Sequence, residues 1–184
     1  MSKVMAKAVY TTVDSPLGEL LLVGEESATA RGGTALASLS MPGQKGGAVV
    51  QDGWVRDDAA FAVIAGQLRS YFAGTRRHFD VQYASGVGTD FQQRVWHALD
   101  TLPYGTTTTY GKLAAQLGIS RAAVRALGTA IGRNPLLVVR PCHRVIGADG
   151  SLTGYAGGLD AKQRLLDLES ENQPETEPKS QPMN

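Results

Sequence analysis

The sequence has very little cysteine and no long hydrophobic segment. Cys142 is the only cysteine among 184 residues, so the chain can form no internal disulfide and has no Cys-x-x-Cys pair for zinc. No apolar run reaches the roughly 20 residues that span a bilayer. The first residues, MSKVMAKAVY, lack the apolar stretch of a secretory signal. These absences predict a cytoplasmic protein without internal disulfides, without a membrane-spanning segment and without a metal ion.

Acidic residues are absent from one long window. No Asp or Glu occurs between Asp100 and Asp149, although the chain has 17 acidic and 18 basic residues and a net charge of only +1. The window contains six basic residues, Lys112, Arg121, Arg125, Arg133, Arg140 and Arg144. Such a one-signed segment is typical of a surface that faces phosphates, although a chance gap in a neutral chain gives the same pattern.

Apolar residues, in contrast, are frequent enough to build a packed core, because they make up 42% of the chain. Two β-rich runs, 8–13 and 19–23, flank Ser-Pro-Leu-Gly and predict a β-hairpin. Residues 24–53 are rich in Gly, Ser and Ala, which predicts weak strands and loops. Apolar spacing over 61–74 predicts an amphipathic helix, and alternation over 79–83 predicts a strand.

The flexible sequence ASGVG at 84–88 predicts a domain boundary, with an N-terminal domain over 1–85 and a C-terminal domain over 86–170. A polar, proline-bearing segment follows at 171–184. We expect this tail to be disordered, because it has almost no apolar residue to bury.

The C-terminal domain shows helix signals. Thr89 with Gln92 predicts a capping box, and Pro103 follows the helix as a stop. Two short helices come next, 109–118 with Thr109 as cap and 120–132 with Ser120 as cap. Their tight connection favours a helix-turn-helix, although an ordinary helical hairpin fits the same pattern. After these come a predicted buried strand at 136–139, a glycine-rich loop at 147–158 and a helix at 159–169 with an apolar face that includes Leu159.

The stretch RPCHRVIG places the single thiol, Cys142, between Arg140 and Arg144 and next to His143. A cysteine nucleophile reacts as its thiolate, which adjacent positive charge and a histidine base favour. Glu169 on the last helix is a candidate to orient the histidine. An inert buried thiol and a cysteine hydrolase remain alternatives, and neighbouring residues on a strand would point to opposite faces.

Several motifs occur together around this thiol: DFQQRVW, PYGTTTTYGKLA, VRALG, RNP, PCHRVIG and GYAGGL. In this order they closely resemble the O6-alkylguanine-DNA alkyltransferases, over about residues 89–169. The N-terminal part, with SPLGELLLVG, resembles the family's ribonuclease-H-like domain. The resemblance implies an α+β fold, with a small sheet domain followed by a winged-helix-like helical domain that carries the helix-turn-helix.

The resemblance also implies DNA repair by one irreversible transfer of an alkyl group from O6 of guanine, and from O4 of thymine, to Cys142. His143 matches the base that acts through a water, and Glu169 matches the carboxylate that orients it. Asn134 matches a brace of the active-site segment, and Tyr110 a residue that rotates the nucleotide. Residues matching the guanine pocket are Val145, Tyr155 and Ala156. Residues matching the minor-groove helix are Val124, Ala126 and Gly128, with Arg125 entering the base stack.

Three departures from the family pattern stand out. Arg140 replaces the usual aliphatic residue, and it is either exposed or in contact with DNA. The turn before Arg125 is one residue longer than usual, so Arg121 is an alternative for the inserted arginine. The N-terminal zinc set of some members is missing, because the histidines are scattered.

The expected partner is double-stranded DNA containing alkylated guanine, bound by base flipping without a cofactor. We expect no membrane contact and a monomer, with cooperative binding along DNA left open. An alkyltransferase-like protein that binds lesions without repairing them is the alternative function.

Overall fold

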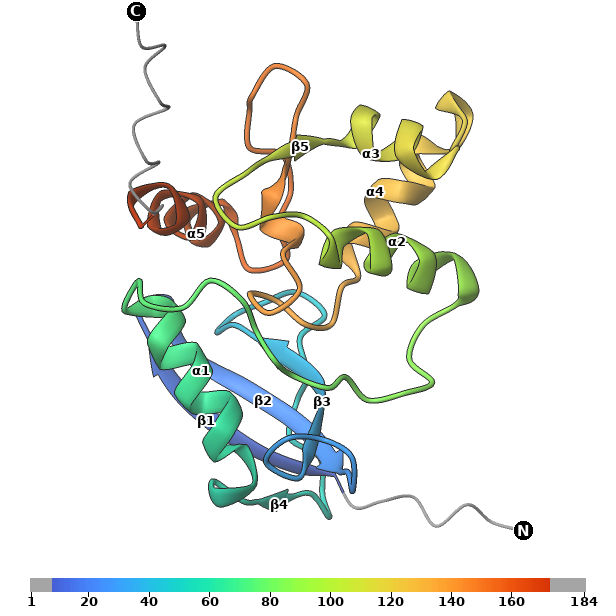
Figure 1. The fold of residues 1–184 in the computed structure, drawn as a ribbon. Coiled ribbons are helices and arrows are strands. Elements are labelled where there is room, and N and C mark those ends of the chain that lie inside the picture. Colours follow the sequence, from blue (N-terminus) through green and yellow to red (C-terminus); the bar gives the residue numbers. More distant parts are fainter. Residues whose placement is uncertain (1–7, 173–184) are drawn as a thin grey trace, which may run out of the picture.

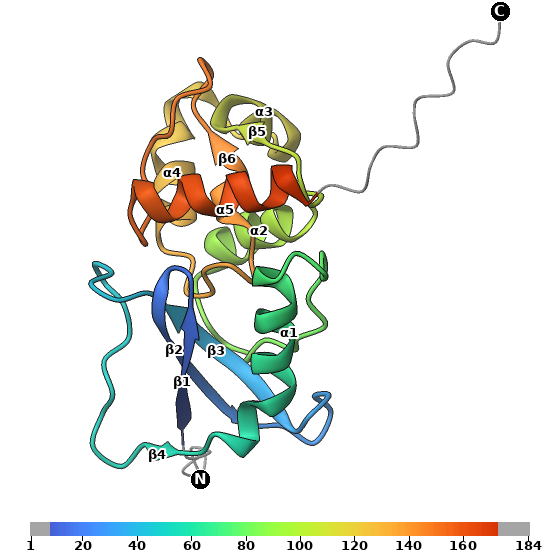
Figure 2. The ribbon, with the colours of Figure 1, turned by 90° about the vertical axis from the view of Figure 1, so that its left-hand side faces the viewer.

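A four-stranded sheet with one covering helix forms the first half of the structure, a computed structural model that describes residues 8–172. The strands are ordered β3-β2-β1-β4, with β4 parallel to β1 and the other pairs antiparallel. Helix α1 packs against one face of the sheet (Figures 1 and 2). The elements are β1 (Val9–Ser15), β2 (Gly18–Glu26), β3 (Thr34–Ser40), β4 (Val55–Arg56), the short 3-10 helix η1 (Ala59–Phe61) and α1 (Ala62–Phe72). We call residues 8–84 the sheet half.

The predicted hairpin and the first predicted helix are both confirmed. β1 and β2 pair along their length, and Gly18 takes the positive φ of 100° that the tight turn requires. The Ser15 hydroxyl closes this turn by accepting from the Leu17 N–H at 3.1 Å and donating to the Gly18 carbonyl at 2.7 Å. Within 24–53, β3 is a full strand of the sheet, stronger than the weak strands expected from its composition.

The predicted strand at 79–83 is wrong, except for one isolated bridge between Tyr83 and Leu36. The physical reason is a side chain on α1. Gln67 donates to the Asp80 carbonyl at 3.0 Å and accepts from the Asp80 N–H at 2.8 Å. Because this side chain uses the backbone groups that a strand partner would need, the segment runs beside the sheet without joining it over its length.

Four helices and a two-stranded parallel ribbon form the second half, residues 90–172, which we call the helical half. The elements are α2 (Asp90–Asp100), β5 (Thr108–Thr109), α3 (Tyr110–Leu117), the 3-10 helices η2 (Arg121–Ala123) and η3 (Cys142–Arg144), α4 (Val124–Gly132), β6 (Val145–Ile146) and α5 (Leu159–Glu171). β5 pairs with β6. Helices α3 and α4 lie on the side of the molecule away from the sheet (Figure 1). The mixed α+β fold class is therefore confirmed.

Helix ends in this half follow their local chemistry. The Thr89 hydroxyl accepts from the Gln92 N–H at 3.1 Å, and the Gln92 side chain accepts from the Thr89 N–H at 3.0 Å, so the predicted capping box is present. The Thr109 hydroxyl caps α3 by accepting from the Lys112 N–H at 3.1 Å, and Gly118 ends the helix with a φ of 68°. Ser120 lies at the predicted N-cap position, but the 3-10 turn η2 precedes α4 and the Ser120 side chain makes no capping bond.

The segment 136–139 is buried as predicted, but it is a turn and not a strand. The Arg140 N–H donates to the Leu136 carbonyl at 3.0 Å, and only Leu136 bridges to the sheet, at Leu39. Val138 has a φ of 69°, a conformation that costs a β-branched residue about 1–3 kcal/mol. The surrounding packing must therefore hold this turn in place.

Helix α5 buries a mixed face and not a purely apolar one. Leu159 is 49% exposed, contrary to the prediction that it belongs to the buried face. Lys162, Leu165 and Glu169 are buried instead, at spacings of three and four residues along one side of the helix. The helix includes Glu171, the first residue of the predicted disordered tail, and the tail from residue 173 lies outside the described residues.

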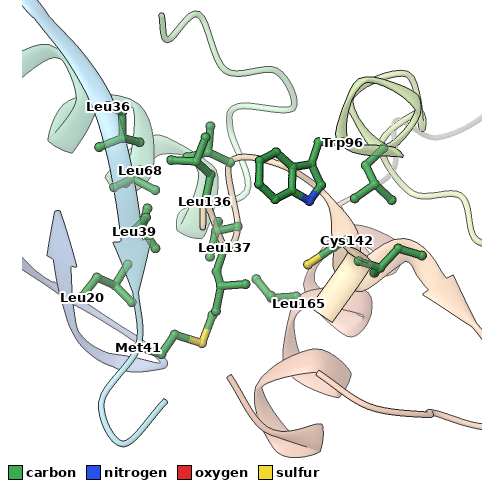
Figure 3. Packing of buried hydrophobic residues seen from close by; sticks show 14 of the residues in the cluster. Leu20, Leu36, Leu39, Met41, Leu68, Trp96, Leu136, Leu137, Cys142 and Leu165 are labelled. Atoms are coloured by element: carbon green, nitrogen blue, oxygen red, sulfur yellow. The ribbon is translucent and has the colours of Figure 1, made fainter. Parts of the chain in front are cut away.

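One hydrophobic cluster connects the two halves. Figure 3 shows it extending from Leu20 and Leu39 on the sheet to Trp96 and Cys142 in the helical half. Backbone bonds join the halves as well, since Leu39 donates to the Pro135 carbonyl at 2.9 Å. The turn that leads to Cys142 is therefore packed directly against the sheet.

Within residues 8–172, none of the helices combines the length and the apolar character that crossing a bilayer requires.

Candidate active site

The thiol of Cys142 lies at the start of a short helical turn inside the protein. Cys142 is 4% exposed and begins η3, so its neighbour His143 follows on a 3-10 helix and not on an extended strand. The Cys142 N–H donates to the Arg140 carbonyl at 2.8 Å. The expectation that adjacent residues would point to opposite faces of a strand therefore does not apply here.

Glu169 connects three side chains near this turn. Its carboxylate lies 2.8 Å from His143 Nε2, and it accepts from Arg144 Nε at 2.7 Å and Arg144 Nη2 at 2.9 Å. The Tyr71 hydroxyl, from α1 of the sheet half, donates to it at 2.6 Å. Because the histidine and the carboxylate are both buried, water does not screen their interaction.

The environment sets the charges of these groups. Burial raises the pKa of the Cys142 thiol, and a hydrogen bond with Asn134 and the Lys162 charge offset this only partly. Burial lowers the pKa of His143 despite its bond to Glu169. Burial alone would raise the pKa of Glu169, but hydrogen bonds from His143 and Arg144 hold it well below its usual range. At neutral pH the site therefore holds a neutral thiol, a neutral imidazole and a carboxylate.

These charges define which imidazole nitrogen can act as a base. An ionised carboxylate only accepts hydrogen bonds, so Nε2 of His143 carries the proton and donates to Glu169. Nδ1 of His143 then holds the free lone pair. It is buried and has no hydrogen-bond partner among residues 8–172. The imidazole can therefore take a proton at Nδ1, and Glu169 would stabilise the resulting cation.

The two arginines that flank the thiol in the sequence turn away from it. Arg144 pairs with Glu169, and Arg140 Nε lies 3.3 Å from the Asp100 carboxylate. The prediction that both belong to a phosphate-facing window is wrong, because both are buried in ion pairs. Arg140 is therefore not exposed, contrary to one of the two expectations for it. The other basic residues of the window, Lys112, Arg121, Arg125 and Arg133, are exposed.

Asn134 ties the ends of the turn together. Its amide nitrogen donates to the Leu136 carbonyl at 3.3 Å and to the Arg140 carbonyl at 3.2 Å, and its oxygen accepts from the Leu136 N–H at 3.0 Å. The side chain is 2% exposed. One buried amide thus satisfies three backbone groups of the segment that precedes Cys142.

A cavity of about 310 Å³ opens beside Cys142. Tyr110, Tyr155 and Ala156, all predicted to act on the nucleotide, line it together with the thiol. The Tyr110 hydroxyl donates to the Thr153 carbonyl at 3.3 Å, on the glycine-rich loop. Other lining residues are Lys45, Gly128, Ile131, Gly132 and Gly154. The cavity is thus bounded by α3, α4, the loop and the cysteine.

Val145, also predicted to read guanine, does not line this cavity. It is fully buried, and its carbonyl accepts from Lys162 Nζ at 2.6 Å. Lys162 also donates to the Thr153 carbonyl at 3.0 Å and the Gly154 carbonyl at 3.2 Å, so it holds the loop to the strand that follows the cysteine. The sequence interpretation missed this lysine, although its spacing from Leu165 and Glu169 marks it as part of the buried face.

The sheet half also reaches the cavity, which the sequence did not indicate. Lys45 lies on the loop after β3 and lines the cavity together with residues of the helical half. The same loop packs against the glycine-rich segment, because a Cβ on Gly157 would collide with Met41 Sδ. A second hollow, of about 670 Å³, continues past Lys45 and Gly132 to Arg133.

The helix-turn-helix presents small and basic side chains to solvent. Arg121, Arg125 and Ala126 are exposed, and Val124 and Gly128 are half-buried. A side chain added at Gly128 would meet nothing within 4 Å. None of these residues forms an ion pair among residues 8–172.

The described part of the chain also contains no cluster of three or more His, Cys, Asp or Glu side chains that could hold a metal.

Fold and site together define a two-part α+β protein whose helical half carries a buried cysteine beside a His–Glu pair. Two family models match the chain: "6-O-methylguanine DNA methyltransferase, ribonuclease-like domain" over residues 8–84 and "6-O-methylguanine DNA methyltransferase, DNA binding domain" over residues 90–171. The chain belongs to the 6-O-methylguanine DNA methyltransferase family.

Similar proteins agree with this assignment. A methylated-DNA–protein-cysteine methyltransferase of Mycolicibacterium paratuberculosis is 48% identical over 90% of this chain and 94% of that protein. One from Methanosarcina acetivorans is 45% identical over 87% of this chain and 97% of that protein. Among solved structures, Mycobacterium tuberculosis OGT in complex with DNA matches with a TM-score of 0.79 and 46% identity, over 91% of this chain and 96% of that one.

Proposed function

We propose that this protein repairs DNA by transferring an alkyl group from O6 of guanine to the sulfur of Cys142. A C–S bond forms while the C–O6 bond breaks, the thiol loses its proton, and guanine regains one. The observation that carries this proposal is the position of Cys142 in the wall of the 310 Å³ cavity, next to a neutral His143 that is bound to Glu169. The chain's close relatives are named for this activity.

Activation of the thiol is the step for which the site needs a base. Because burial keeps Cys142 protonated at rest, its proton must leave as the alkyl group arrives. We infer that Nδ1 of His143 takes this proton through a bridging water, while Glu169 stabilises the imidazolium. Arg144 fixes the Glu169 carboxylate from the other side, through the two hydrogen bonds described above.

Access to the alkylated base requires that it leave the duplex, at a cost of about a few kcal/mol. We propose that α4 enters the minor groove, which suits the small residues Val124, Ala126 and Gly128. Arg125 then occupies the vacated stack, with Arg121 as the alternative, and Tyr110 turns the nucleotide toward the cavity. Both arginines are exposed and form no ion pair within residues 8–172, which supports this assignment.

The flipped guanine would lie against Tyr155, with backbone groups of Cys142, Val145 and Ala156 reading its edge. Asn134 would brace the turn that carries the thiol. The thioether product has no route back to a thiol within this reaction, so we propose that each molecule acts once. O4-alkylthymine is the second substrate that we propose.

We further propose that the protein works in the cytoplasm as a monomer without a cofactor. Cooperative binding of several molecules along DNA is compatible with this proposal. The chain would divide near 84–88 into the two domains predicted from the sequence, 1–85 and 86–170. The similar solved structure in complex with DNA supports DNA as the partner, and we propose that this DNA is double-stranded.

Intact-mass spectrometry tests the proposed function directly. After incubation with a duplex containing O6-methylguanine, the protein is expected to gain the mass of one methyl group, stoichiometrically and at Cys142 in the peptide map. Cys142→Ala should bind the same duplex and gain nothing. Saturated DNA binding by the unmodified protein without any gain in mass would instead indicate a lesion-binding protein that performs no repair.

A further inference from the structure

Arg140 is the residue that the family pattern leaves unexplained, and it forms the centre of a polar cluster behind the thiol. Its Nε lies 3.3 Å from Asp100 Oδ1, and its Nη1 donates to the Asn134 side-chain oxygen at 3.4 Å. The guanidinium also lies over two rings, 4.8 Å from the centre of Tyr83 and 5.1 Å from that of Trp96. A planar guanidinium satisfies such a set of partners, and a lysine cannot do so in the same way.

These partners come from separate parts of the chain. Tyr83 closes the sheet half, where the residues on either side of it bond to Leu36 of β3. Trp96 and Asp100 belong to α2, and Asn134 follows α4. One side chain thus ties the turn before the thiol to the sheet half, to α2 and to the end of α4.

The guanidinium is well shielded from water, but its carboxylate is not fully so. The Arg140 side chain is 9% exposed and the Asp100 side chain 28% exposed. A buried positive charge is costly without a partner, so Arg140 must point toward Asp100 and cannot turn elsewhere. The Arg140–Asp100 ion pair therefore favours one conformation of the turn before Cys142, whatever it adds to the free energy of unfolding.

Arg140 is connected to the thiol by backbone as well as by proximity. Its carbonyl accepts from the Cys142 N–H at 2.8 Å and from the Asn134 amide at 3.2 Å. The turn from Asn134 to Arg140 includes Val138 in its unfavourable left-handed conformation, which other contacts must maintain. A change of the backbone at Arg140 would move the carbonyl that accepts from the Cys142 N–H, and hence would redirect the sulfur.

We propose that Arg140 is a positioning residue for the alkyl transfer: anchored by Asp100, Asn134 and two aromatic rings, it fixes the turn that aims Cys142 into the cavity. The proposal rests on the proposed function. It assigns to Arg140 and Asp100 a role in the rate of transfer and none in DNA binding, because neither residue is on the helix-turn-helix.

The experiment compares Arg140→Met, Asp100→Asn and the double variant. Methionine keeps an unbranched side chain at this position, but it is shorter than arginine and loses the directional bonds. We expect Arg140→Met to lower the transfer rate at saturating DNA by roughly 10- to 100-fold, since small misplacements of reacting groups have effects of that size. The dissociation constant for alkylated DNA should stay within about twofold, because the contacts with phosphate are elsewhere. Arg31→Met, which breaks the exposed pair with Asp80, is the matched control and should change neither quantity.

The double variant distinguishes positioning from simple stabilisation. With both charges removed, its melting temperature should recover relative to Asp100→Asn, which leaves the guanidinium without its carboxylate. Its transfer rate should remain low. Recovery of both quantities, or a wild-type rate in Arg140→Met, would overturn the proposal.

A thiol probe keeps the test independent of the proposed function. The rate at which iodoacetamide modifies Cys142 should change in Arg140→Met and in the double variant, but not in Arg31→Met. If the wild-type protein accepts no methyl group from DNA, the proposed function fails while this comparison still tests the role of Arg140. Equal iodoacetamide rates in all variants would contradict the positioning role.

Discussion

Arg144 and Glu169 meet at two points in the centre of the site, with Nε–Oε1 at 2.7 Å and Nη2–Oε2 at 2.9 Å. This two-point contact fixes the plane of the carboxylate. The oxygen that faces His143 is therefore held in one direction, and the imidazole with it. The arginine beside the thiol in sequence thus acts on the histidine, through a carboxylate 25 residues away.

The first prediction concerns this carboxylate. Glu169→Gln should destabilise the protein by about 3–5 kcal/mol, because Arg144 is left buried without a charged partner. The transfer rate should fall as well, since the amide no longer stabilises an imidazolium. Urea unfolding and single-turnover kinetics measure the two effects. Glu171→Gln, on the exposed side of the same helix, is the control and should stay within about 0.5 kcal/mol of the wild type. An unchanged stability in Glu169→Gln would refute the burial of this ion pair.

A second prediction follows from the lowered pKa values of His143 and Glu169. Each group is deprotonated in the folded state at a pH where the unfolded chain binds a proton. Each group therefore contributes its full stabilisation when the pH is above the pKa that it has in the unfolded chain. The free energy of unfolding declines as the pH falls, first below about 6.5 for the histidine and then below about 4.5 for the glutamate. Urea unfolding at pH 7.5, 6.5, 5.5 and 4.5, set around these values, should show the decline.

Two histidine variants separate the contributions to this pH dependence. His143→Gln should remove the part of the decline that begins below about pH 6.5. His97→Gln replaces an exposed histidine and serves as the matched control. If the wild-type stability were constant between pH 7.5 and 5.5, His143 would not be the buried neutral group described above.

The third prediction decides which arginine enters the base stack. Arg125→Ala should slow the transfer from duplex DNA by roughly tenfold or more, because unstacking is then no longer offset. Transfer from the same lesion in single-stranded DNA should change much less. Arg121→Ala should reduce affinity only through the loss of one phosphate contact. The reverse pattern for the two variants would assign the role to Arg121.

The fourth prediction concerns Lys45, the cation that the sheet half contributes to the cavity. Lys45→Ala should weaken binding of alkylated DNA and reduce the slope of log K against log salt by about one, as expected for one lost phosphate contact. Lys45→Arg should restore both. Arg31→Ala, in the same half but paired with Asp80, serves as the control. Identical salt slopes for the wild type and Lys45→Ala would show that this lysine does not contact DNA.

The sequence was a good guide wherever structure depends on neighbouring residues. The hairpin around Gly18, the capping box at Thr89 and the end of α3 at Gly118 all follow from side chains within a few positions. The same holds for the motifs around Cys142, whose order along the chain is enough to indicate the family.

The features that could not be predicted from the sequence depend on contacts between residues far apart in the chain. Arg140 points inward because Asp100, 40 residues earlier, supplies its carboxylate. The apolar segment 136–139 is a turn because Asn134 uses the backbone groups that a strand would pair. Similarly, Gln67 prevents 79–83 from joining the sheet. Such contacts depend on tertiary packing, which overrides local propensity. Lys162 differs from these cases, because its helical spacing from Leu165 and Glu169 in the sequence already indicates that it belongs to the buried face of α5.

The hydrogen bond from Tyr71 to Glu169 has a consequence for how the molecule can be divided. A fragment beginning at residue 86 would contain the cysteine, its histidine and the whole helix-turn-helix. It would also lose the hydroxyl that completes the coordination of Glu169 and the sheet surface on which the turn at 136–140 rests. The two halves are therefore not modules that merely share a chain. The N-terminal half holds Glu169 through Tyr71 and the turn through Leu39, so its removal would release groups that position the thiol.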